Sequence, residues 1–175
     1  MINALLNKDD RPVIKIKLTA PDWAVEFVGL AMLILLLILP LIYLPQLPER
    51  IPIHFNGAGT PDGYGNKSSI WFLPAVGAFM YFLLTGLSAF PQIYNFPVKI
   101  TEKNAFVQYR LATRFIRILK TLILILFVYL TYQTINSALQ KTLGLGKSFL
   151  PVFLIITIFP IIFYVEKALN NKHGI

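Results

Sequence analysis

The stretch AVEFVGLAMLILLLILPLIYL, residues 24–44, decides the class of protein. From residue 27 to residue 48 the chain carries no Asp, Glu, Lys or Arg. A helix needs about 20 mostly apolar residues to cross the hydrocarbon core of a bilayer. A cleaved signal peptide would have a shorter apolar segment and a small-residue cleavage site, whereas this run is longer and ends in LPQLPER. We therefore predict a retained transmembrane helix.

The composition extends this prediction to the whole chain. Of the 175 residues, 56% are hydrophobic and 14% are charged, and the mean hydropathy is +0.65. A soluble domain usually carries about 25% charged residues. So few charges do not cover the surface of a soluble globule, and the chain contains no cysteine for disulfides or thiolate metal sites. We predict an all-α membrane protein with one small domain.

Three further charge-free runs follow, at residues 68–98, 121–140 and 148–165. Together with the first run they predict four transmembrane helices. Pro160 lies inside the last run, where a proline kinks a helix without preventing it from spanning. The predicted order is a tail at 1–23, spans at 24–44, 70–91, 117–138 and 148–166, connecting segments at 45–69 and 92–116, and a tail at 167–175.

The distribution of the basic residues predicts the orientation. A net charge of +8 in a soluble protein would suggest a nucleic-acid partner. Here the basic residues are divided unequally between the two sides of the membrane, so the positive-inside rule explains the net charge. We therefore predict no nucleic-acid partner. We predict a multi-pass protein of the cell inner (plasma) membrane, with both termini cytoplasmic and residues 45–69 outside. Twelve basic residues lie on the cytoplasmic side (Lys8, Arg11, Lys15, Lys17, Lys99, Lys103, Arg110, Arg114, Arg117, Lys120, Lys167 and Lys172) and four lie outside (Arg50, Lys67, Lys141 and Lys147).

The segment TEKNAFVQYRLATRFIRILK, residues 101–120, reads as a basic amphipathic helix, with Thr101 as its N-cap. Arg110, Arg114 and Arg117 recur at helical spacing, and such a helix attracts anionic lipid headgroups at a cytoplasmic interface. We predict headgroup contacts for these arginines. The alternative, compatible with the first, is an ordinary extension of the third span.

Polar residues near the span ends carry two further predictions. Glu26 and Glu166 fall near the cytoplasmic ends of their helices, within reach of Arg114, Arg117 or Lys120. Near the outer end of the third span, the polar residues indicate either the lining of an outer cavity or the exit of the helix from the bilayer. This second group is Thr131, Gln133, Thr134, Asn136 and Ser137.

The first two spans are joined by LPQLPERIPIHFNGAGTPDGYGNKSSIWFLP, residues 44–74. A phosphate loop requires Gly-Lys in sequence, but Asn66 separates the glycine from the lysine. A calcium loop starting at Asp62 requires glutamate at its twelfth position, which is Leu73. A zinc site requires three or four ligands, and the loop offers His54, Asp62 and Glu49. We predict no metal and no cofactor.

The same segment carries structural signals. RIPIHF, residues 50–55, alternates β-branched residues as a strand does, and NGAGTPDGYGNK, residues 56–67, is typical of turns. An ordered cap packed on the helix ends is the expected result. Its polar centre would be either an internal hydrogen-bond network or a ligand-facing surface, formed by His54, Asn56, Asp62 and Lys67.

The pattern Leu-Pro-x-x-Ile-Pro-x-His-Phe-Asn-x-x-Gly-x-x-Asp-x-x-Gly-x-Lys, beginning at Leu47, resembles that of a bacterial family, the domain of unknown function numbered 1648. Residues 96–120 also look like the segment that many such proteins carry after their second helix. The best-understood relatives are SdpI-type immunity proteins, which protect a cell from its own toxic peptide and retain a repressor at the membrane. These relatives have additional helices, so the resemblance carries over the motif and not those partners.

The expected function is non-enzymatic, namely an SdpI-like sensor, immunity or binding protein that uses the outer loop. The expected partners are the lipid bilayer, with its anionic headgroups, and a peptide or membrane protein. Two alternatives remain at this point: an accessory or structural membrane subunit that packs with a partner, and a metal- or lipid-dependent enzyme.

Overall fold

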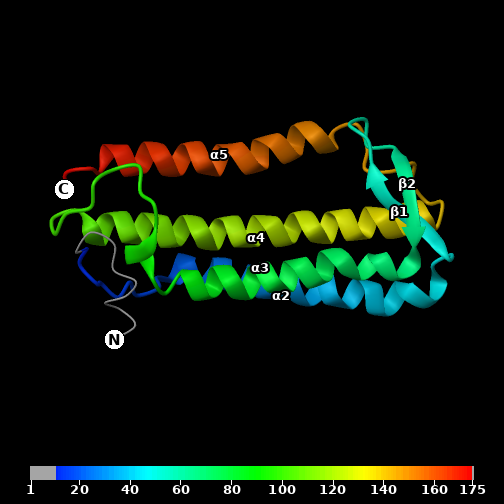
Figure 1. Cartoon of the computed structure of the whole chain (residues 1–175), viewed down its shortest axis with the longest axis horizontal. Helices are drawn as coiled ribbons and strands as arrows, with labels where there is room; N and C mark the ends of the chain where they lie inside the picture. Colours follow the sequence, from blue (N-terminus) through cyan, green and yellow to red (C-terminus); the bar gives the residue numbers. More distant parts are fainter. Residues whose placement is uncertain (1–10, 175) are drawn as a thin grey trace.

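A computed structural model describes residues 11–174. Four long helices lie side by side along the length of the molecule: α2 (Ala20–Tyr43), α3 (Phe72–Leu87), α4 (Ala105–Ala138) and α5 (Phe149–Asn170) (Figure 1). Each is long and apolar enough to cross a membrane, where α2 and α3 are counted together with the short turn beside each of them. The predicted four-span helical architecture is therefore confirmed. Lys8 of the predicted N-terminal tail lies outside the described residues.

The two ends of the bundle differ in structure. The start of α2 and the end of α5 lie at one end, together with the turn η3 (Pro91–Ile93) that follows α3 (Figure 1). The opposite end carries an antiparallel hairpin of β1 (Arg50–Phe55) and β2 (Pro61–Asn66). The turn η1 (Leu44–Gln46) joins α2 to the hairpin, and the turn η2 (Lys67–Trp71) joins the hairpin to α3. The hairpin therefore lies on the opposite side of any membrane that the bundle crosses from the start of α2 and the end of α5.

The hairpin lies in the segment that the sequence predicted to be a structured loop between the first two spans. β1 occupies the run that alternation predicted as a strand, but residues 61–66 also form a strand where the sequence predicted turn residues. Pro, Asp and Gly are poor strand formers. They form β2 because the turn that Asn56 and Gly59 make is complete before residue 61. Residues 61–66 therefore run back antiparallel to β1 and pair with it.

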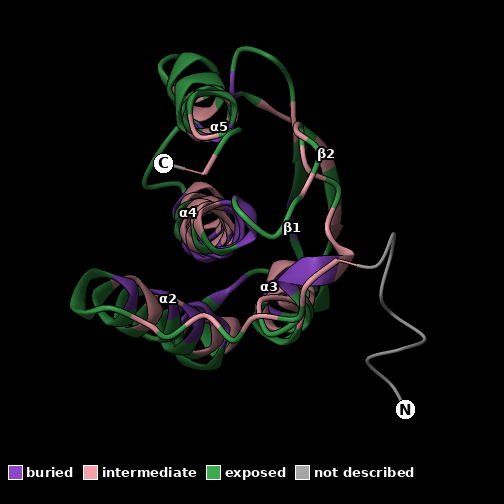
Figure 2. Ribbon diagram, turned by 90° about the vertical axis from the view of Figure 1, so that its left-hand side faces the viewer, coloured by how far each residue is buried: buried purple, intermediate pink, exposed green. Residues whose placement is uncertain are grey.

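Helix α4 is the central element of the bundle. It contacts α2, α3 and α5 as well as β1, and Figure 2 shows α2 and α3 on one side of it and α5 on the other. Apolar side chains of α2 and α4 meet in the cluster of Leu33, Leu36 and Leu124. Helix α5 is attached more loosely, because Ala168 is its single buried residue.

The helix boundaries follow local capping chemistry. α2 begins at Ala20, before the predicted residue 24, because the Asp22 carboxylate accepts a hydrogen bond from the Thr19 backbone N–H at 2.8 Å. α4 runs unbroken for 34 residues, about 51 Å, so the basic segment extends the third span. Asn104, rather than the predicted Thr101, directly precedes the helix. Thr101 still caps the turn before it, because its hydroxyl accepts from the Asn104 N–H at 3.4 Å and the Asn104 side chain accepts from the Thr101 N–H at 2.8 Å.

Candidate functional site

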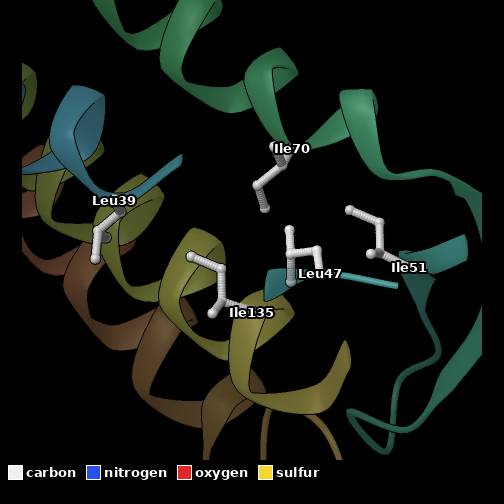
Figure 3. Close-up of a cluster of buried hydrophobic side chains, with 5 residues drawn as sticks. All are labelled: Leu39, Leu47, Ile51, Ile70 and Ile135. Carbon is white, nitrogen blue, oxygen red and sulfur yellow. The ribbon is translucent and has the colours of Figure 1, made fainter. Parts of the chain in front are cut away.

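Apolar side chains fix the hairpin on the helix ends. Ile51 of β1 is 1% exposed and Leu47 is 4% exposed. Figure 3 shows them packed together with three residues of the helices and turns, namely Leu39, Ile70 and Ile135. This cluster joins α2, the hairpin, η2 and α4, so the hairpin is a folded cap on the bundle rather than a free loop.

Asn56 and Gly59 build the turn of the hairpin. The Gly59 N–H donates to the Asn56 carbonyl at 2.8 Å, and Gly59 has φ +78°, as in three-residue hairpin loops that end in a left-handed residue. The side-chain oxygen of Asn56 accepts from the N–H groups of Ala58 at 3.0 Å and Thr60 at 3.1 Å. The side-chain oxygen of Asn56 is therefore occupied by hydrogen bonds within the cap, which is how asparagine commonly stabilises turns.

His54 and Asp62 form a hydrogen-bonded pair on the exposed side of the hairpin. His54 Nδ1 lies 2.5 Å from Asp62 Oδ1, and their side chains are 70% and 43% exposed. Gly63 lies opposite His54 in the ladder. A side chain at Gly63 would place its Cβ 2.9 Å from the His54 Cβ, so the glycine leaves room for the imidazole. A pair this exposed contributes only about 0–1 kcal/mol to stability.

Lys67 closes the base of the hairpin. Its ammonium donates to the Glu49 carboxylate at 2.8 Å, and its backbone N–H donates to the Glu49 carbonyl at 3.0 Å. The predicted polar centre is thus divided: His54 and Asp62 meet, while Asn56 and Lys67 bond elsewhere in the cap. The three loop candidates for a metal also diverge, because Glu49 pairs with Lys67 and not with His54.

A cavity of about 990 Å³ lies beneath the hairpin. Its walls come from β1, from η2 and the start of α3, and from α4 and α5. Thr131 and Thr134 line it, which supports the outer-cavity alternative for those two residues. The rest of the cavity could not be located from the sequence, because apolar residues that line a cavity look the same as those that face lipid.

A charge cluster occupies the other end of the bundle, between α2 and α4. Arg114 Nε donates to Asp22 at 2.8 Å, Lys120 Nζ donates to Glu26 at 2.6 Å, and Arg117 lies 3.4 Å from Glu26. The predicted pairing of Glu26 is confirmed. Lys120, 1% exposed, also donates to Thr85 and lies 4.4 Å from the ring centre of Tyr81, both on α3.

These contacts correct the predicted use of the basic helix. Arg117 is 5% exposed and paired inside the bundle, so it does not face lipid headgroups. The Arg114 side chain is still 41% exposed beside its partner Asp22. Arg110 is exposed and lies over the Phe106 ring, so the predicted headgroup contact stays a prediction for Arg110 and Arg114. Within residues 11–174, Glu166 makes no ion pair.

Two comparisons relate the chain to known proteins. Residues 31–78 match the model of the domain of unknown function DUF1648. The matched segment contains most of α2, the whole hairpin and the first half of α3, which confirms the resemblance found in the sequence. The chain is also similar to an uncharacterized protein of the archaeon Archaeoglobus fulgidus, at 32% identity over 88 residues.

That alignment covers 46% of this chain and 48% of the archaeal protein, so the chain matches about half of its relative's length. No solved structure matches the chain.

Proposed function

We propose that this protein is a non-enzymatic membrane binding protein that uses the hairpin cap, on the extracytoplasmic face, to recognise a peptide ligand. The proposed role is that of a sensor or immunity protein, as in the SdpI-type proteins that the motif resembles. The proposed orientation, with both termini in the cytoplasm of an inner membrane, rests on the sequence, which assigns twelve basic residues to one side of the membrane and four to the other.

The His54–Asp62 pair is the observation that carries the proposal. Asn56 is engaged with the turn, Lys67 with Glu49, and Ile51 with the apolar cluster beneath the cap. His54 and Asp62 are the polar motif residues that project from the cap, and a surface pair of this kind adds little stability. Their presence on the exposed side of the hairpin is therefore better explained by contact with a ligand than by folding.

A protection assay tests the proposal. A strain that lacks the protein is complemented with the wild type, His54→Ala or Asp62→Asn, and challenged with medium conditioned by the parent strain. We expect each variant to weaken ligand binding at least about tenfold, or about 1.4 kcal/mol, and therefore to reduce survival.

Glu49→Gln is the matched control, because it removes the Lys67–Glu49 ion pair at the base of the same hairpin. It should protect as the wild type does. Equal protection by all variants at equal membrane abundance would refute a binding role for the pair. Loss of the variants from the membrane would instead favour a structural role.

One observation favours a second candidate, an accessory subunit that packs with a partner in the membrane. Helix α5 exposes large apolar residues on several faces, among them Ile155, Phe159 and Ile162 at 66%, 64% and 60%. A lipid-facing helix has the same appearance, so the hairpin pair remains the stronger argument.

A further inference from the structure

Thr131 of α4 has an unusual environment. It is 1% exposed, and among the described residues its hydroxyl has no hydrogen-bond partner. Threonine within a helix commonly bonds back to a carbonyl one turn earlier, as Thr113 does to Tyr109 and Thr157 to Phe153, both at 2.8 Å. Thr131 does not make this bond. A buried hydroxyl without a partner is destabilising, so the position needs an explanation.

The cavity beneath the hairpin supplies a setting for this hydroxyl. Thr131 lines it, together with Leu126 and Leu130 of α4 and Phe149 and Phe153 of α5. The rim at the end of the bundle is polar, formed by His54, Ser68 and Ser69. The cavity therefore has an apolar wall at the depth of the spans and a polar mouth at their end. At about 990 Å³ it is at the upper end of the usual size of small-molecule sites, about 300–1,000 Å³.

A second cavity extends this space along the bundle. It measures about 610 Å³, lies between α4 and α5, and shares Leu126, Leu145, Phe149 and Phe153 with the first. It reaches Leu119 on α4, and Lys147 lines its other end. The combined space is long and apolar, with hydroxyl groups, an imidazole and an ammonium gathered at one end.

We propose that this space holds one lipid molecule of the surrounding bilayer, with an acyl chain between α4 and α5. Rotation of the Thr131 side chain about χ1 turns its covered hydroxyl into the cavity, where it donates to an ester or phosphate oxygen of that lipid, and Lys147 pairs with an anionic headgroup. A soluble ligand does not match an apolar wall at membrane depth. A lipid does match it, because its acyl chain lies at the depth of the apolar wall and its polar oxygens lie at the depth of the polar mouth. The inference does not depend on the proposed function, because it holds for either orientation of the hairpin.

Photocrosslinking tests the site. The full chain is reconstituted in nanodiscs of phosphatidylglycerol that contain a fraction of the same lipid with a photoactivatable diazirine in one acyl chain. Crosslinked peptides are then located by mass spectrometry. We expect crosslinks to concentrate on residues 119–133 and 145–157. An even distribution over all four spans would show ordinary annular lipid and would overturn the proposal.

Two variants sharpen the test. Leu130→Trp narrows the cavity beside Thr131, and Thr131→Val removes the hydroxyl with little change in the shape of the side chain. We expect Leu130→Trp to abolish the concentrated crosslinks, and Thr131→Val to reduce lipid retained through detergent purification about fivefold, as expected for one hydrogen bond. The matched control is Ile155→Trp, on the exposed surface of α5 and 66% exposed, which should change neither result.

The isosteric variant keeps the proposal falsifiable if the tryptophan variant fails to fold. If Thr131 is merely an unpaired hydroxyl, Thr131→Val will stabilise the protein and leave the retained lipid unchanged, and the proposal is then wrong. If the hydroxyl binds lipid, the valine variant will lose lipid, and its stability will respond less than the wild type's to added phosphatidylglycerol.

Discussion

Replacing Lys120 by methionine is expected to lower the free energy of unfolding by about 3 kcal/mol. The Lys120 ammonium is buried and donates to Glu26 at 2.6 Å and to the Thr85 hydroxyl at 2.8 Å. Methionine fills a similar volume but leaves the Glu26 carboxylate without its nearest cation. Arg117 remains 3.4 Å away, so we expect the lower part of the range for a broken buried pair, about 3–5 kcal/mol.

Reversible unfolding in mixed detergent micelles measures this effect. Lys141→Met is the control, because it makes the same change at an exposed lysine of the opposite end of the bundle. The double variant with Glu26→Gln should be less destabilised than the sum of the two single variants, since residues in direct contact are energetically coupled. If Lys120→Met costs no more than Lys141→Met, the cluster does not hold α2, α3 and α4 together.

Replacing Ile51 by alanine is expected to cost about 2–4 kcal/mol and to loosen the hairpin. Ile51 is 1% exposed and packs against residues of α2, η2 and α4, so truncation leaves a cavity at the joint between hairpin and bundle (Figure 3). Amide hydrogens of residues 50–66 should then exchange with solvent faster, because the hairpin opens more often without its anchor.

Ile53 offers a matched control two residues along the same strand. It is 55% exposed and lies outside the apolar cluster that holds Ile51, so Ile53→Ala should cost under about 1 kcal/mol and leave exchange across the hairpin nearly unchanged. Equal effects of the two substitutions would mean that the hairpin does not depend on the apolar cluster beneath it.

The sequence predicted the spans well because their signal is continuous. Each of the four runs lacks charges over most of a membrane thickness, and no arrangement of a soluble chain accounts for that. The boundaries were less accurate because they depend on single caps. Thr19 and Asp22 start α2 early, whereas Asn104 rather than Thr101 precedes α4.

The candidate site was predicted only in part, because contacts between distant residues decide it. The motif marked His54, Asn56, Asp62 and Lys67 as one group, but the register of the hairpin pairs only two of them. The burial of Arg117 could likewise not be predicted from the sequence. Its helical spacing matches that of Arg110 and Arg114, and only the packing of α2 against α4 distinguishes it from them.

Cysteine accessibility tests the central claim, that the hairpin cap and the termini lie on opposite sides of the membrane with the hairpin outside. The chain has no cysteine, so Ala58→Cys in the exposed turn and Lys103→Cys at the opposite end each provide a single thiol. With a membrane-impermeant maleimide applied to intact cells, we expect Ala58→Cys to be labelled, and Lys103→Cys to be labelled only after the membrane is permeabilised. Labelling of Lys103→Cys but not Ala58→Cys in intact cells, or equal labelling of both, would contradict the account.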